Sequence, residues 1–406
     1  MAVAAKSRTV VESLAQFDLA AHASSPVRSV AVSTLSDAQT LVYLGTQSGT
    51  LVLLQVVASP DASPPSVGDD ARALPPPARQ PGGGSVSFLR SAAVARESPV
   101  DSVHVLAEIG KVLVLSEGSL FLIDSLLAQP AKKIPPFKGI SAIARRFRAG
   151  GATGGSDLSD YSVNALDNPS AGTRLLQKFG SGIRANGVKV KEAEQLRQQA
   201  EGSYIFAIVI GKRLVIADFS AISESLVVLR EMQCMEGVKA MVWLDDSIMV
   251  GTVSEYILYS CITGQSGVIF SLPDVSSSPW LKLLRKEWKV LLLVDNVGVI
   301  VDSYGQPAGG SLVFRRGLES VAEVSSYVMV VKDGKMDVYH KKSGSCIQTL
   351  PFAGEGVGPC FVADEENANG NLVVVASPSK GRLFEPVGQG TRPWSGPVLL
   401  DPPDYS

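Results

Sequence analysis

The chain has 406 residues, of which 45% are hydrophobic and 19% charged, and its formal net charge at pH 7 is −2. This composition provides enough apolar side chains for a large core and excludes a generally disordered chain, while the near-zero charge excludes whole-chain electrostatic attraction to nucleic acid or to an anionic membrane. No apolar run approaches the roughly 18 residues of a membrane-spanning helix, and the N-terminal residues lack the apolar core of a signal peptide.

The first paired apolar segments in the chain are Leu41–Leu44 and Leu51–Leu54, which flank the sequence "GTQSG". Serine and glycine at the centre of this stretch predict a β-hairpin. A hairpin with one solvent-exposed face would alternate apolar and polar residues, whereas these two runs are continuously apolar. Both faces of this hairpin are therefore expected to be covered.

Six further hairpins follow the same plan, most of them with glycine at or near the turn. They cover Lys111–Asp124, Tyr204–Phe219, Ser247–Ser260, Val290–Gly305, Tyr327–His340 and Leu372–Pro386. Semi-apolar strands precede and follow most of these hairpins, which gives four strands per unit. Once two insertions are removed, the units are about 40 residues long, as in propeller blades. We therefore predict an all-β fold, a seven-bladed β-propeller that forms a single domain over residues 1–406.

The seventh predicted unit lacks a strand after its hairpin, because the residues that follow it are rich in proline. The segment Arg8–Phe17, "RTVVESLAQF", precedes the first complete unit and has the pattern of a strand with no partner nearby. We expect it to pair beside Gly381–Pro386 and to close the seventh blade. Closure by a terminal strand would remove the exposed sheet edges of an open array.

Two segments interrupt the repeat. Residues 58–85 are rich in Pro, Gly, Ser and Asp and are predicted to be a disordered loop. Residues 142–201 form a polar, Gly-rich insertion that ends in a predicted short charged helix over Lys189–Ala200. Parallel βαβ units are disfavoured because helical periodicity is almost absent, and an immunoglobulin-type array would need about 100 residues per unit.

The residue types that usually carry chemistry do not fall into a catalytic or metal-binding pattern. The three histidines, His22, His104 and His340, lie far apart and match no metal motif. The four cysteines have no CxxC spacing, which indicates reduced thiols and a cytosolic protein. The Gly-rich residues 149–157 and the "IGKRL" turn lack the pattern of a phosphate-binding loop. We therefore expect no enzymatic activity, no metal and no cofactor.

Arg145, Arg146 and Arg148, with Phe147 between them, form the densest cationic cluster of the sequence. One interpretation is that these side chains are the solvated flank of a loop. The other is that they contact an acidic partner or phosphoinositide headgroups. The three arginines are the predicted partner-binding residues.

Two hairpins resemble signatures of the citron homology (CNH) domain, a diverged propeller. "LVYLGTQSGTLVLLQV" looks like the first-blade signature of the family, and "AIVIGKRLVIADF" looks like its middle signature, a strand followed by Gly-Lys-Lys/Arg and a second strand. The Trp-Asp and Gly-His marks of WD repeats are missing. With "KSRTVVESLAQFDL" and the long Gly/Ser insertion, the chain is most similar to the N-terminal part of vacuolar sorting tether subunits, near the TGF-β-receptor-associated protein branch and its plant members.

This resemblance implies a non-enzymatic interaction module of the CORVET or HOPS class of endosomal tethers, cytoplasmic and peripheral on endosome and vacuole membranes. It implies recognition of a Rab-family GTPase and assembly with other tether subunits through an α-solenoid that follows the propeller in the family. This chain ends at Ser406, so we expect it to be an N-terminal fragment or a short product. No nucleic-acid partner is expected. The alternative left open is a scaffold in receptor or kinase signalling, as in other CNH proteins.

Overall fold

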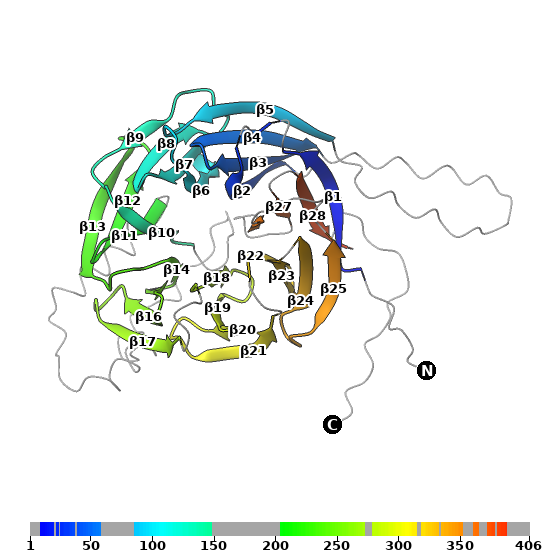
Figure 1. Ribbon diagram of the computed structural model, residues 1–406. Coiled ribbons are helices and arrows are strands. Elements are labelled where there is room, and N and C mark those ends of the chain that lie inside the picture. The colour runs from blue at the N-terminus through cyan, green and yellow to red at the C-terminus, as the bar shows by residue number, and fades with distance from the viewer. Residues whose placement is uncertain are drawn as a thin grey trace, which may run out of the picture.

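The strands form seven antiparallel four-stranded sheets arranged around a central axis, which is the architecture of a seven-bladed β-propeller (Figure 1). The first strand of each blade lies innermost, since these strands contact one another around the axis. The predicted all-β, seven-bladed fold is confirmed. The computed structural model describes residues 9–19, 22–23, 25–36, 39–57, 85–147, 204–272, 278–314, 318–332, 334–351, 360–364, 372–377 and 380–387.

Blades 1 to 3 follow the chain order from the innermost strand outward. Blade 1 comprises β2 (Val27–Ser36), β3 (Gln39–Thr46), β4 (Thr50–Val57) and β5 (Ser85–Ala93). Blade 2 comprises β6 (Val100–Leu106), β7 (Lys111–Ser116), β8 (Ser119–Asp124) and β9 (Lys132–Ile134). Blade 3 comprises β10 (Ile140–Arg145), β11 (Tyr204–Ile210), β12 (Arg213–Ser220) and β13 (Ser225–Gln233).

Blades 4 to 6 repeat this order, and blade 7 departs from it. Blade 4 comprises β14 (Ala240–Leu244), β15 (Ser247–Gly251), β16 (Glu255–Ser260) and β17 (Ser266–Ser271). Blade 5 comprises β18 (Leu281–Leu284), β19 (Lys289–Val294), β20 (Val297–Val301) and β21 (Pro307–Val313). Blade 6 comprises β22 (Ser320–Val324), β23 (Tyr327–Lys332), β24 (Lys335–His340) and β25 (Cys346–Pro351). Blade 7 comprises β26 (Phe361–Asp364), β27 (Val373–Ala376), β28 (Lys380–Pro386) and, outermost, β1 (Val11–Asp18).

Helical structure is nearly absent from the described ranges. They contain one 3₁₀ turn, η1 (Ala107–Ile109), and no α-helix. Nothing in these ranges therefore qualifies as a membrane-crossing helix.

The continuous apolar runs of β3 and β4 are explained by the stacking of blades. Leu41 and Tyr43 pack on one side with Val112 of β7, in a cluster shared by blades 1 and 2. The alternate residue Val42 packs on the other side with Val374 of β27, in a cluster shared by blades 7 and 1. Side chains of a strand alternate between its faces, so a strand between two blades needs apolar residues at every position. The expectation that both faces are covered is confirmed.

The N-terminal strand closes the ring as predicted. Strand β1 pairs antiparallel with β28, with Val11 opposite Pro386 and Asp18 opposite Lys380. Phe17 lies opposite Gly381, and a Cβ atom built on Gly381 would approach the Phe17 ring to 2.0 Å. Glycine is therefore required at this position because the Phe17 ring occupies the space of a side chain.

A buried side-chain amide holds the start of β1 against blade 6. Gln348 of β25 accepts hydrogen bonds through Oε1 from the backbone N–H groups of Val10 and Val11, at 2.9 and 3.0 Å. Its Nε2 donates to the carbonyl oxygen of Val11 at 3.0 Å. The primary amide of Gln348 thus presents one acceptor and one donor, as a neighbouring strand would. We call these three hydrogen bonds the Gln348 clamp.

The predicted boundaries of the two insertions need correction. Residues 142–145 belong to β10, and Ser85 begins β5, so these residues are strand rather than insertion. The innermost strand of blade 3 buries every second side chain, and two of these three, Ile140, Ala142 and Ala144, are alanines. Its sequence is therefore only weakly apolar and resembles the polar segment that follows. Residues 58–84 and 148–203, including the predicted helix Lys189–Ala200, lie outside the described residues.

The strand ends that flank the two insertions lie on the same face of the propeller. Residues 58–84 join the third strand of blade 1 to its outermost strand, and residues 148–203 join the innermost strand of blade 3 to the second. All blades wind in the same direction, so these two kinds of turn open on one side of the ring. We call this side the insertion face.

Candidate functional site

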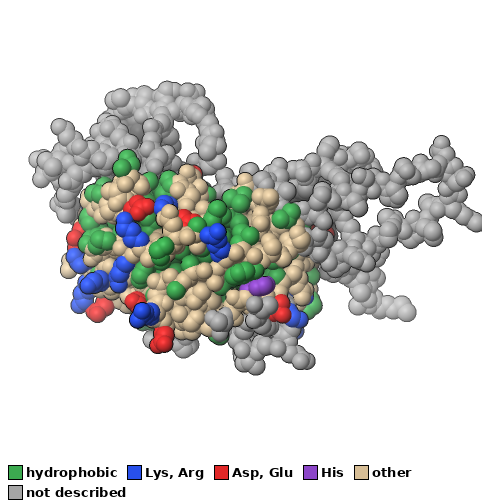
Figure 2. All heavy atoms as spheres, turned by 90° about the horizontal axis from the view of Figure 1, so that it is seen from above, with side chains coloured by type: hydrophobic (Ala, Val, Ile, Leu, Met, Phe, Trp, Pro, Cys, Tyr) green, Lys and Arg blue, Asp and Glu red, His purple; other side chains and the backbone are tan. Residues whose placement is uncertain are grey.

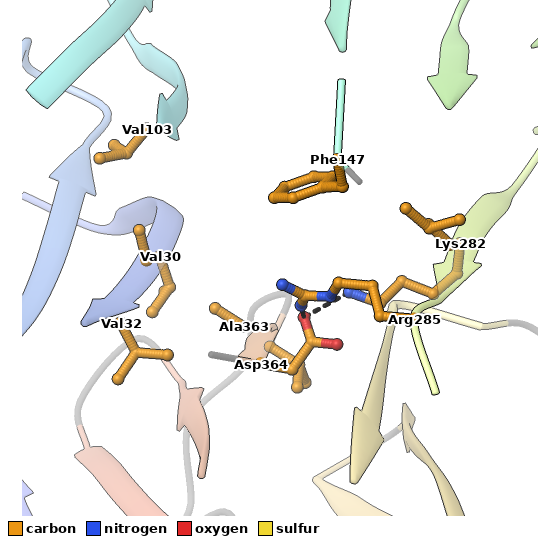
Figure 3. A pocket seen from close by; sticks show the side chains of 11 residues that line it. Val30, Val32, Val103, Phe147, Lys282, Arg285, Ala363 and Asp364 are labelled. Atoms are coloured by element: carbon orange, nitrogen blue, oxygen red, sulfur yellow. Dashed lines mark hydrogen bonds and ion pairs between the residues drawn. The ribbon is translucent and has the colours of Figure 1, made fainter. Parts of the chain in front are cut away.

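The central channel contains a cavity of about 210 Å³. Innermost strands from four blades line it, and Phe147, which follows β10, contributes from a fifth. Figure 3 shows three valines, Val30, Val32 and Val103, on one side and Lys282 and Arg285 on the other. We call these two sides the valine wall and the cationic wall. The cavity therefore joins an apolar surface to a charged one.

The two cations of the cationic wall, which come from blade 5, are held by one carboxylate of blade 7. Asp364 ends β26 of blade 7, and its Oδ1 accepts from the Lys282 ammonium and lies 3.2 Å from Nη2 of Arg285. The side chains are 23%, 14% and 6% exposed for Lys282, Arg285 and Asp364. Blades 5 and 7, which are not neighbours in the ring, are thus bridged across the channel (Figure 3).

Two opposite effects act on the ionisation of Asp364. Burial alone would raise its pKa, but the Lys282 ammonium and the Arg285 guanidinium outweigh burial and hold the pKa of this carboxyl below its usual range. The second oxygen, Oδ2, accepts the backbone N–H of Glu323 at 3.1 Å. Asp364 is therefore a fixed anion that anchors the cationic wall.

A second buried ion pair, Lys341 with Glu323, lies next to Asp364. Lys341 donates to Glu323 at 2.5 Å and to Glu287 at 2.6 Å, and both Lys341 and Glu323 are nearly inaccessible, at 4% and 5%. Glu323 also accepts the backbone N–H of Arg285 at 2.6 Å. Burial raises the pKa of the Glu323 carboxyl, against the opposing effect of the Lys341 ammonium. This pair ties blade 6 to the segment that carries Arg285.

Two guanidinium groups lie near the ring of Phe147. The guanidinium carbons of Arg145 and Arg285 each lie 5.3 Å from the centre of its ring. Cations over the face of an aromatic ring are attracted by its quadrupole. Phe147 thus connects blade 3 to blade 5 and covers one side of the cavity, as Figure 3 shows.

The structure places Arg145 and Arg146, two of the three predicted site residues, in contacts between blades. Arg145 donates to the carbonyl oxygen of Val105 at 2.9 Å and stacks 4.8 Å from the ring centre of Tyr204. Arg146 lies 3.7 Å from the carboxylate of Asp246 in blade 4. Their side chains are 14% and 20% exposed, so neither is a fully solvated loop flank.

Arg148 lies outside the described residues. The structure therefore brings Arg145 and Arg146 together with Phe147 near the channel and leaves Arg148 unplaced. Their role in binding a partner stays a prediction.

Sequence reasoning missed the cationic wall and its anion. Lys282 and Asp364 are single charges in short innermost strands, and nothing in the sequence shows that they meet across the channel. A usable signal was the lysine within "WLKLL", because a charge inside an otherwise apolar strand indicates a position beside a polar cavity.

The outermost strands form the rim of the ring, where exposed apolar residues are spread over several blades. Figure 2 shows the part of the rim that lies at the top of Figure 1, near β5 and β9, with apolar, basic and acidic side chains interspersed. Several exposed large apolar residues lie in different outermost strands: Val227 and Val228 in β13, Val268 in β17 and Val313 in β21. Single exposed apolar residues are ordinary on protein surfaces, so the channel is the stronger candidate site.

The described lining of the cavity combines charged and aliphatic side chains. The cavity lining contains no His, Cys or Ser, and its one lysine is ion-paired with Asp364. In the described ranges, no three His, Cys, Asp or Glu side chains are grouped as for a metal ion. What the cavity offers is two cations beside aliphatic groups, an arrangement that can hold an anionic group with an apolar neighbour.

Comparisons with known proteins identify a domain family and a similar plant protein. Residues 88–360 match the CNH domain family. The chain is 45% identical over 382 residues to Vacuolar sorting protein 3 of Arabidopsis thaliana, an alignment that covers 92% of this chain and 36% of that protein. The chain thus spans little more than a third of the length of this curated relative. The expected similarity to a plant vacuolar sorting protein is confirmed.

Two solved structures were found to be similar to the chain, and one of them supports the fold. The WD40 domain of Neurospora crassa Pan2 is similar, with a TM-score of 0.51 and 11% identity, over 95% of this chain and 98% of that chain. The AfRom2 CNH domain gives a TM-score of 0.48 and 12% identity, over 93% of this chain and 98% of that chain. At such low identity, the likeness to Pan2 supports the propeller fold and nothing more specific.

Proposed function

Because the chain belongs to the CNH domain family, which it matches over residues 88–360, we propose that it is a non-enzymatic protein-interaction module that acts in vacuolar protein sorting. The observation that carries this proposal is the 45% identity over 382 residues to Vacuolar sorting protein 3 of Arabidopsis thaliana. The same observation favours sorting over the signalling scaffold that the sequence left open. A rigid ring with buried seams between blades suits a platform whose exposed surfaces bind other proteins.

The proposal extends to partners and location. The propeller recognises a Rab-family GTPase in its GTP-bound state and works within a membrane-tethering complex of the CORVET or HOPS class. It is cytoplasmic and peripheral on endosome and vacuole membranes, and other subunits bind through an α-solenoid in the longer protein. These points rest on family resemblance and on the relative named above.

A pull-down tests the Rab contact. The 406-residue chain is immobilised and exposed to a panel of Rab GTPases, each in a GTP-locked and a GDP-locked form. We expect retention of at least one endosomal or vacuolar Rab in its GTP-locked form only. Retention that is independent of the nucleotide, or no retention across the panel, would contradict the Rab part of the proposal.

The cationic cluster is the proposed contact for an acidic surface of such a partner. Arg146 is the position to test, because Arg146→Lys keeps the positive charge while Arg146→Gln removes it. If the charge binds the partner, the Lys variant retains the Rab and the Gln variant loses it, at equal thermal stability. Equal loss in both variants would instead indicate that only the inter-blade contact with Asp246 matters.

A further inference from the structure

The channel cavity has two unlike walls that face each other. The valine wall comes from β2 and β6 in blades 1 and 2, and the cationic wall comes from blade 5 (Figure 3). A ligand that filled the cavity would contact aliphatic groups on one side and N–H donors on the other. Such a cavity selects a ligand with an apolar group and an anionic group a short distance apart.

The charge of the lining favours an anion. Lys282 and Arg285 are the two cations, Asp364 is the single anion, and the other lining residues are uncharged, which leaves one net positive charge. Both cations converge on Oδ1 of Asp364. The Lys282 ammonium has three N–H donors, and its contact with Asp364 uses only part of that donor capacity.

The surrounding contacts allow Lys282 to exchange partners. Asp364 keeps its position through the backbone N–H of Glu323 and through Arg285. Arg285 is in turn held by its stacking on Phe147 and by the acceptance of its backbone N–H by Glu323. Lys282 has a flexible stem and the most exposed side chain of the three, so it can turn towards an incoming carboxylate without disturbing the rest.

The size and the apolar half of the cavity decide between ligand classes. A volume of about 210 Å³ holds one or two side chains rather than a folded domain. A polyphosphorylated headgroup would place charge against the valine wall, where its hydration would be lost without compensation. A short peptide segment with an acidic residue beside Leu, Ile or Val matches both walls.

We propose that this cavity is a peptide-binding site for a partner segment in which an Asp or Glu side chain lies next to an aliphatic one. The carboxylate pairs with Lys282 and Arg285, and the aliphatic side chain packs on Val30, Val32 and Val103. The site lies next to the proposed Rab contact but uses other residues than Arg146, the position tested there, so either proposal can fail without the other.

The test uses a random heptapeptide display library selected on the full 406-residue chain. We expect enriched peptides to carry Asp or Glu beside Leu, Ile or Val. In fluorescence anisotropy, the dissociation constant should rise by about tenfold or more for Lys282→Met, as expected for loss of one hydrogen bond to a charged group. Replacement of the peptide's acidic residue by its amide should give a similar loss on the wild-type chain.

Matched variants separate binding from folding. Lys132→Met removes an ion-paired lysine outside the channel, 3.0 Å from Glu224, and should leave peptide affinity unchanged. Val30→Met fills the valine wall and should also abolish binding, which keeps the test decisive if Lys282→Met does not fold. Enriched peptides without an acidic residue, or equal affinity for Lys282→Met, would overturn the proposal. Binding of inositol hexakisphosphate without enrichment of any peptide would overturn it as well.

Discussion

The seams beside blade 1 and the channel beside blades 5 to 7 are stabilised by different physics. Between blades 1 and 2, Leu41, Tyr43 and Leu53 lie in an apolar cluster from which water is excluded. In the channel, Lys282, Arg285 and Asp364 are held by charge. Apolar burial is non-directional and tolerates many sequences, whereas buried charges demand partners at defined positions. The apolar seams therefore hold neighbouring blades together, and the channel is where buried charges of blades 5 and 7 meet.

The largest expected effect on stability comes from replacing Lys341, the most buried cation among the ion pairs near the channel. Lys341→Met leaves Glu323 buried without its ammonium partner, and such losses cost about 3–5 kcal/mol of unfolding free energy. Urea unfolding at pH 7 measures it. Lys342→Met, at the exposed neighbouring lysine, is the control and should change little. A loss below about 1 kcal/mol would place the stabilising contribution of these ion pairs close to that of surface ion pairs.

The apolar seam is tested by Leu53→Ala. Leu53 is fully buried between blades 1 and 2, and truncation of such a leucine costs about 3 kcal/mol through lost burial and the cavity that remains. The matched change on the rim, Val268→Ala, removes an exposed side chain and should cost less than about 0.5 kcal/mol. Similar costs at the two positions would contradict the description of the seam as the core.

A smaller effect is expected at the Gln348 clamp. Gln348→Ala leaves the N–H groups of Val10 and Val11 and the carbonyl of Val11 without this partner, and an unsatisfied buried polar group costs about 1–3 kcal/mol. Hydrogen exchange at the amides of Val10 and Val11 should accelerate before exchange elsewhere in the ring. Gln129→Ala, at an exposed glutamine, is the control. Unchanged protection of β1 would show that its pairing with β28 suffices.

The smallest expected effect is the pH dependence of the channel, where two carboxyl groups act in opposite directions. Asp364 has a pKa below its ordinary value of 3.8, so its contribution is full above pH 3.8 and is lost as the pH falls through its lower folded pKa. Glu323 has a pKa above its ordinary value of 4.5, so its contribution is full below pH 4.5 and is lost as the pH rises through its folded pKa.

Glu323→Gln separates these two contributions. In urea unfolding between pH 4.5 and 7, the wild-type chain should gain stability on acidification from the Glu323 carboxyl, and the variant should lack that gain. Below pH 3.8 both should lose stability, because Asp364 is present in each. Identical profiles above pH 4.5 would indicate that burial does not govern the ionisation of Glu323.

The sequence predicted the strands and hairpins whose burial gives a local apolar pattern. It did not predict contacts between charged residues that lie far apart in the chain. The continuous apolar runs around Gly45–Gly49 predicted covered hairpins, and the missing strand after Pro386 predicted closure by β1, because both follow from local composition. Strand β10 was missed since its buried residues are mostly alanines followed by polar sequence. The meeting of Lys282 with Asp364 could not be predicted, because it depends on the curvature of the whole ring.

The Gln348 clamp joins parts of the chain 338 positions apart, which bears on how the protein is made. Strand β1 leaves the ribosome long before its partner strand β28 and the Gln348 amide are synthesised. Until then β1 has an unpaired edge, and pairings at such sequence separation are slow to form and expose strands to aggregation. The nascent chain therefore has a window in which protection of its first strand by a chaperone would favour correct ring closure.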